Sequence, residues 1–308
     1  MKTILVPIDH TPAAEHTLAY ANKLAVRWPA EVVLLYCHQL DATAGEPTAA
    51  LLAEEQRLRG LVERLRYQQL TRQNGRRIRY RYRVLAGALP DHVQAEAIRC
   101  AADLVVMGLE HIDCCHQAVP ANHAASLVEL LTCPVLVVPA GRRSLPHRVV
   151  FSADFTDVAA GLMPQLAALA GAFPAPLDLV QVYAFADRPK RRQLQQALNV
   201  AAAQLAWLGP VALHLLEDEA RLEGVDEFCA RTQAELLVIA PTSTGQLVQY
   251  FATCYVKTRA YHTQIPVLIL PAVRLEMAPE TCCAQCVQHP VRQVLNVAAG
   301  AYHTLNWV

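Results

Sequence analysis

Two short passages of the sequence occur twice, and this duplication limits what the chain can fold into. Residues 103–108 read DLVVMG and are followed by CPVLVVP at residues 133–139. Residues 235–240 read ELLVIA and are followed by IPVLILP at residues 265–271. Both pairs are separated by 132 residues, so the two units align without a gap. The duplication predicts two domains of the same fold, and any site in one of them must be sought in the other.

The beginnings of the two units match as well. LVPIDHT at residues 5–11 resembles VFSADFT at residues 150–156, at a separation of 145, so the second unit is 13 residues shorter in its middle. A chain of 308 residues is long enough for two domains that each bury a core. We expect a first repeat at residues 1–141 and a second repeat at residues 147–273. Residues 274–308 belong to neither and form a C-terminal extension without an assigned role.

Short β-branched apolar runs alternate with amphipathic segments through both repeats. The expected strands are residues 4–8, 32–36, 77–85, 104–107 and 135–138, then 148–152, 177–183, 211–216, 236–239 and 267–270. The expected helices are residues 13–26, 49–73, 90–101 and 122–131, then 157–173, 191–208, 223–232 and 247–263. This alternation predicts the α/β class, with mostly parallel strands, right-handed crossovers and helices on both faces of the sheet.

The composition excludes several classes of function. Basic and acidic residues balance at 27 each, so charge gives no reason to expect nucleic acid or an anionic membrane as a partner. No apolar run approaches the roughly 20 residues that span a bilayer, and the N-terminus reaches Asp9 too early for a signal-peptide core. We therefore expect a cytoplasmic protein, in which most of the ten cysteines are reduced core residues.

Three motifs of the first repeat occur together at a particular spacing. They are VPID at residues 6–9, ADLVVMG at residues 102–108 and CPVLVVP at residues 133–139. In this combination the chain resembles the universal stress protein family in its tandem two-domain form, from residue 1 to about residue 272. The resemblance implies two Rossmann-like domains, similar to adenine nucleotide alpha hydrolases, each with a five-stranded sheet.

The resemblance also carries expectations about partners and activity. Members of the family frequently pair through their last strand, which implies that residues 135–138 and 267–270 face each other within this one chain. A monomer then satisfies the usual pairing, although a homodimer remains open. We expect a stress-response protein that binds a partner protein or a small ligand, without turnover. It is not expected to be an enzyme, since the sequence has no Gly-x-Ser-x-Gly elbow and no intact phosphate loop.

The ATP-binding branch of the family carries a glycine loop after its fourth strand. Its pattern is Gly, two residues, Gly, nine residues, Gly, and then Ser or Thr. Glycines let backbone N–H groups approach phosphate oxygens, and the hydroxyl and a helix N-terminus add further donors. Aligned on both sides, the four positions fall on Gly108, His111, Ala121 and Asn122 in the first repeat. Only the first glycine is present.

The second repeat has lost the loop completely. Its four equivalent residues are Ala240, Ser243, Thr253 and Cys254. Each lost hydrogen bond to a charged phosphate oxygen costs about 1.5–3 kcal/mol, so several together remove micromolar affinity. We therefore expect neither ATP nor another cofactor. The alternative is a sensor that binds ATP or AMP at the degenerate site of the first repeat.

The candidate ligand-binding residues follow the carboxyl ends of strands, where open α/β sheets place their ligands. Asp9 and Asp154 each follow the first strand of a repeat, and the resemblance implies contact with the adenine end of a nucleotide. The alternative is that each carboxylate caps its own turn, with Thr11 and Thr156 as helix N-caps. The candidate residues are Pro7, Asp9, Thr11, Gly108, His111, Asn122, Asp154, Thr156, Ser243 and Thr253.

Two clusters of cysteine raise the possibility of metal or redox chemistry. Cys114, Cys115 and His116 are consecutive, and Cys283 and Cys286 form a Cys-x-x-Cys pair. Neither cluster has the paired spacing that identifies a zinc motif, so no metal site is expected. A metal-responsive or redox-responsive protein is the third class of function that stays open.

Overall fold

The computed structural model describes residues 1–38, 47–70, 77–109, 123–156, 162–169, 171–241 and 243–271. All of them lie within one compact unit, Met1–Val273. In the first repeat, strands and helices alternate as the sequence predicts. The elements are β1 (Lys2–Pro7), α1 (Pro12–Arg27), β2 (Ala30–His38), α2 (Pro47–Leu70), β3 (Tyr80–Ala86), α3 (Leu89–Arg99), β4 (Leu104–Gly108), α4 (His123–Leu130) and β5 (Val135–Val138).

The second repeat follows the same order, with short 3-10 helices added. Its elements are β6 (Val149–Ser152), α5 (Leu162–Leu169), β7 (Leu177–Tyr183), η1 (Phe185–Lys190), α6 (Arg191–Leu205), η2 (Ala206–Leu208), β8 (Val211–Glu217), α7 (Arg221–Thr232), β9 (Leu236–Ile239), α8 (Thr244–Tyr250), α9 (Thr253–Thr258), η3 (Tyr261–Thr263) and β10 (Val267–Ile269).

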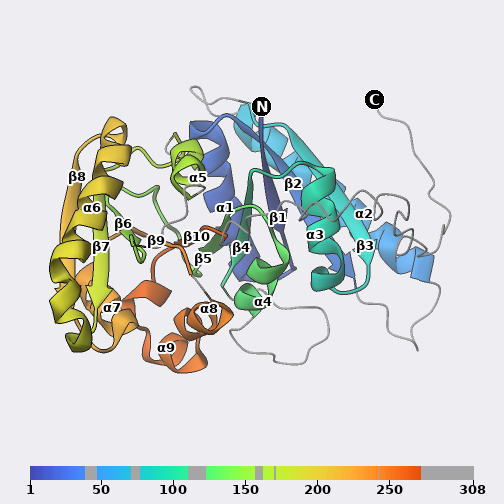
Figure 1. Cartoon of the computed structure of the whole chain (residues 1–308). Helices are drawn as coiled ribbons and strands as arrows, with labels where there is room; N and C mark the ends of the chain where they lie inside the picture. The colour runs from blue at the N-terminus through green and yellow to red at the C-terminus, as the bar shows by residue number, and fades with distance from the viewer. Residues whose placement is uncertain are drawn as a thin grey trace, which may run out of the picture. The chain divides into compact units, whose positions relative to one another are not determined.

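All ten strands join in a single sheet, in the order β3-β2-β1-β4-β5-β10-β9-β6-β7-β8. The second half of this order repeats the first half in reverse. Every pairing is parallel except that of β5 with β10, which is antiparallel and lies in the middle of the sheet (Figure 1). There Leu136 lies opposite Leu268, its own equivalent at a separation of 132 residues. The two repeats are therefore related by a local two-fold axis through this pair of leucines.

Each face of the sheet is covered by helices from both repeats, which confirms the predicted α/β class. One core layer packs α1, α2, α5 and α6 against strand residues such as Ile4, Leu136 and Phe151. The opposite layer packs α3, α4, α7 and α8 against residues such as Leu5 and Val150. Since both layers contain residues of both repeats, the core is continuous across the central strand pair. The domain boundaries at residues 141 and 147 stay a prediction.

The single helix expected at residues 247–263 is wrong, because the chain forms α8, α9 and η3 there instead. Ala252, between α8 and α9, has an extended backbone (φ −60°, ψ 140°). The carbonyl of Tyr250 therefore loses its helical partner, and Nε2 of the buried His262 lies 3.0 Å from it. The backbone N–H of His262 donates to Oδ1 of Asp226 on α7 at 2.7 Å, and its Nδ1 lies 2.6 Å from the same oxygen. A tertiary contact thus stabilises the break.

Candidate functional site

The two aspartates predicted from the sequence occupy equivalent turns, each two residues after a strand. Oδ1 of Asp9 accepts a hydrogen bond from the backbone N–H of Thr11 at 2.9 Å, and from its hydroxyl. Oδ1 of Asp154 accepts from the backbone N–H of Thr156 at 3.1 Å and from its hydroxyl at 2.6 Å. Thr11 also caps α1, since its hydroxyl oxygen accepts from the N–H of Ala14 at 3.3 Å. Both aspartates therefore make the turn contacts expected of capping residues.

Asp154 differs from Asp9 in one further contact. Nε2 of the buried Gln181 donates to its Oδ1 at 3.0 Å. Oδ1 of Asp154 thus accepts three hydrogen bonds, while none from the described residues reaches Oδ2. The carboxylate is held in a fixed orientation with one oxygen available to a ligand.

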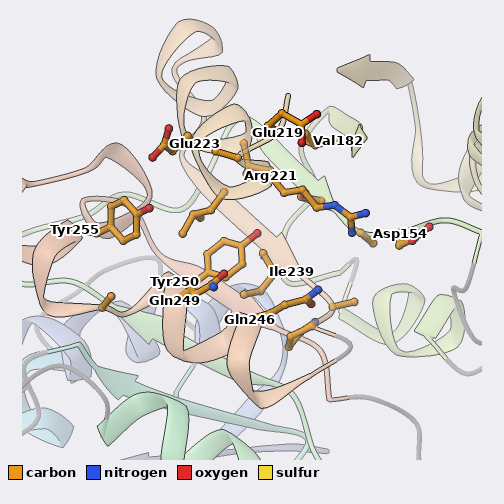
Figure 2. A pocket seen from close by; sticks show the side chains of 18 of the residues that line it. Asp154, Val182, Glu219, Arg221, Glu223, Ile239, Gln246, Gln249, Tyr250 and Tyr255 are labelled. Atoms are coloured by element: carbon orange, nitrogen blue, oxygen red, sulfur yellow. The ribbon is translucent and has the colours of Figure 1, made fainter. Parts of the chain in front are cut away.

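Asp154 lies on the wall of a cavity of about 630 Å³ in the second repeat, which we call the α7 cavity (Figure 2). Residues at the carboxyl ends of β6, β7 and β9 form its floor, and the start of α7 together with α8 and α9 forms its sides. Ligands of open α/β sheets bind at this edge, and the volume lies in the range of small-molecule sites.

The α7 cavity combines an apolar floor with a charged rim. Val182 and Ile239 belong to the floor. At the rim Arg221 extends from the first residue of α7, with its guanidinium directed toward Asp154 (Figure 2). Glu219 and Glu223 flank it. The rim therefore carries three carboxylates and one guanidinium.

Arg221 is the group most clearly available to a ligand. Its side chain is exposed, and among the residues that the structure describes it makes no hydrogen bond or ion pair. Glu219 is partly occupied, since its Oε1 accepts from the backbone N–H of Phe185 at 2.9 Å. A guanidinium recognises a planar anionic or carbonyl group well because it offers several donors in one plane.

Tyr250 on α8 adds a neutral polar group that points into the cavity (Figure 2). Burial raises the pKa of its phenol, with a smaller contribution in the same direction from Cys229, while a hydrogen bond with Ser152 acts against the shift. The phenol thus stays protonated at neutral pH and offers a hydrogen bond without charge.

The remaining candidates from the sequence fall into three groups. Ser243 caps α8, since its hydroxyl oxygen accepts from the N–H of Gln246 at 3.4 Å, and Gln246 lines the α7 cavity. Thr253 begins α9 between two cavity residues, Ala252 and Cys254.

Pro7 and Gly108 end β1 and β4 in the first repeat, away from this cavity. His111 and Asn122, like the two cysteine clusters, lie outside the described residues. Within the described ranges, no group of His, Cys, Asp and Glu could hold a metal ion.

Sequence reasoning missed the charged rim. Its residues Glu219, Arg221 and Glu223 belong to no motif, and their equivalents in the first repeat are Gly87, Leu89 and Asp91. Leu89 is buried at 2% exposure, so the second repeat has an arginine where the first has a core leucine. The available signal was position alone, because residues 218–223 follow a strand end at the edge that binds ligands.

Cys254 offers a chemical probe of the cavity, which it lines from an exposed position. Burial raises the pKa of Cys133 and of Cys229 to about 12, and it also raises that of Cys100. Because the thiolate is the reactive form, we expect iodoacetamide at pH 8 to label Cys254 well before these three. Peptide mass spectrometry over a time course measures this order. Equal labelling of Cys229 in the folded protein would contradict the structure.

The family model described as "Universal stress protein family" matches residues 1–139. No curated protein matches the chain. None of the helices in the described part is long and apolar enough to cross a membrane.

Two solved structures resemble most of the chain. A universal stress protein from Archaeoglobus fulgidus is 12% identical with a TM-score of 0.60, and the match covers 87% of this chain and 98% of that one. A protein of unknown function from Pseudomonas aeruginosa is 16% identical with a TM-score of 0.56, over 88% and 92% of the two chains. At these identities the likeness shows the fold, whereas the family match rests on the first repeat. Through residues 1–139, the chain therefore belongs to the universal stress protein family.

Proposed function

We propose that this chain acts in the stress response by binding a small ligand, without turnover, and that the α7 cavity of the second repeat is its binding site. The observation that carries the proposal is Arg221, an unpaired guanidinium at the rim of an apolar-floored cavity, directed toward Asp154. A few convergent polar groups over an apolar surface are typical of small-molecule sites. The described lining contains no histidine or lysine to serve as a general base, which favours binding over catalysis.

The charge of the rim argues against a triphosphate. ATP with magnesium keeps a net negative charge, and Asp154, Glu219 and Glu223 outnumber the single guanidinium. Like charges repel in a partly desolvated cavity more strongly than in water. The rim instead matches a ligand with at most one anionic group for Arg221 and with hydrogen-bond donors for the carboxylates, such as an amino acid or a nucleoside.

We expect 1 mM ATP with magnesium to leave the melting temperature unchanged within about 1 °C. A site with a dissociation constant of about 10 μM would add roughly 2.7 kcal/mol of stability at this concentration. For a chain of roughly this size, that would raise the melting temperature by about 5–10 °C. Differential scanning fluorimetry with ATP measures the shift.

A shift of that size would favour the nucleotide sensor instead, and two equivalent substitutions locate the site. Loss of the shift in Asp9→Asn places the nucleotide in the first repeat, and loss in Asp154→Asn places it in the second.

The positive test uses a panel of amino acids and nucleosides at 1 mM, with protection of Cys254 from iodoacetamide as the readout. Arg221→Ala should abolish the protection by any compound that gives it in the wild type. Arg192→Ala, an exposed arginine on α6 outside the cavity, should leave it unchanged. Failure of the whole panel to protect Cys254 or to raise the melting temperature would contradict a small-ligand site of this kind.

A further inference from the structure

A second cavity lies beneath α5, near the amino ends of β6, β7 and β9. Its volume is about 200 Å³, and we call it the α5 cavity. Its described lining consists of eleven residues with apolar or aromatic side chains: Val149, Leu166, Leu169, Phe173, Pro174, Ala175, Leu177, Trp207, Leu236, Val238 and Leu268. It shares no described lining residue with the α7 cavity, which lies at the opposite ends of the strands.

The first repeat provides an internal comparison for this cavity. The strand register makes Ile4 equivalent to Val149 and Val32 equivalent to Leu177. Ile4 and Val32 are 0% exposed, whereas Val149 and Leu177 are 4% and 6% exposed. The same core layer is therefore closed in the first repeat and slightly open in the second.

The sequence explains the difference. In the first repeat Tyr80 pairs with Val32, and both Tyr80 and Ile78 are buried in this core layer. In the second repeat Val211 pairs with Leu177, so a valine stands in place of the tyrosine and Gly209 in place of Ile78. Two large core side chains have thus become one small side chain and a glycine.

The connection that carries these residues is also shorter in the second repeat. Residues 71–79 join α2 to β3, whereas only residues 209–210 join η2 to β8. Gly209 has φ +123°, a conformation that favours glycine, and it directly follows η2. The short connection therefore leaves space beneath α5 that no longer side chain from this turn fills.

The chemistry of the lining defines what the space can hold. Apart from the indole N–H of Trp207, no lining side chain offers water a hydrogen-bond partner. Apolar cavities of about 150 Å³ stay dry and accept a benzene-sized molecule. Trp207 is 64% exposed and lines the cavity, which makes it a large aromatic group accessible from solvent.

We propose that the α5 cavity is a second binding site, for a small uncharged hydrocarbon group of one-ring size. Trp207 contacts the ligand from the solvent side. The site is independent of the ligand proposed for the α7 cavity, since the two cavities lie at opposite edges of the sheet.

The test uses toluene as the probe, with binding measured from the rise in melting temperature over a toluene titration. Ala175→Leu places a larger side chain in the cavity, so it should raise the melting temperature without ligand and weaken toluene binding at least tenfold. Its matched control is Ala30→Leu, at the equivalent position of the first repeat, where Ala30 is 6% exposed in a closed core. That substitution should lower the melting temperature and leave toluene affinity unchanged.

A second variant does not depend on the core. Trp207→Ala removes an exposed side chain and should weaken toluene binding severalfold, whereas Tyr67→Ala, at a 69% exposed position on α2, should not. Hexanoate serves as a second probe, and binding of hexanoate but not toluene would assign the site to acyl chains with a charged head. Three results would overturn the proposal: no shift with toluene in the wild type, unchanged toluene affinity in Ala175→Leu, or a lower melting temperature of Ala175→Leu without ligand.

Discussion

Replacing Leu136 by alanine is expected to lower the free energy of unfolding by about 2–5 kcal/mol. Leu136 is 0% exposed in β5 and lies opposite Leu268 of β10, where the two repeats meet. Truncation removes apolar contacts from the core layer that both repeats share, and the neighbouring backbone is held by strand pairing on both sides. Urea denaturation followed by circular dichroism measures the change.

The local two-fold axis provides the controls for this experiment. Leu268→Ala should cost a similar amount, because it truncates the equivalent residue on the same axis. The two substitutions together should deviate from additivity, since the residues are in direct strand contact. Val26→Ala, at a 39% exposed position, should change the stability by less than about 0.5 kcal/mol. Two separate unfolding transitions, with only one of them moved by Leu136→Ala, would contradict a continuous core.

The second large effect is expected for His262→Ala, with a loss of about 2–4 kcal/mol. His262 is 0% exposed and joins three elements: its own η3, Asp226 of α7 and the carbonyl of Tyr250 at the end of α8. Removing the ring leaves that carbonyl and the carboxylate without their ring partner, and it also leaves a void. Thermal unfolding of the variant measures the loss.

The same variant should alter the α7 cavity, because Tyr250 and Cys254 lie on either side of the break that His262 stabilises. We expect faster labelling of Cys254 in His262→Ala than in the wild type. His147→Ala is the control, since its ring contacts Glu235 from an 83% exposed position and should matter little. An unchanged melting temperature in His262→Ala would show that the break between α8 and α9 does not need this contact.

Local sequence predicted the strands better than the helices. Residues 135–138, 177–183 and 236–239 form strands with the predicted bounds, because short β-branched apolar runs between turns fit few other structures. The helix expected at 247–263 was wrong because its break depends on His262 meeting Asp226, a residue 36 positions earlier in another helix. No periodicity within the segment records that contact.

The candidate site was predicted only in part, for a related reason. The family pattern drew attention to glycine positions and to Asp9 and Asp154, which recur in both repeats. Arg221 and Tyr250 have no counterpart in that pattern, and the role of Arg221 depends on a strand and a helix that the fold places beside Asp154. Comparing the repeats residue by residue would have found the change from Leu89 to Arg221, although not the cavity beside it.

A homodimer encoded by one gene must carry the same side chains in both subunits, so a change that improves one subunit's site alters the other too. The covalent union of two such halves at β5 and β10 removes that constraint. The charged rim at residues 219–223 and the shortened turn at Gly209 each occur on one side of the axis only. The joint between the halves thus allows one protein to diversify two binding surfaces separately while the shared sheet keeps its symmetry.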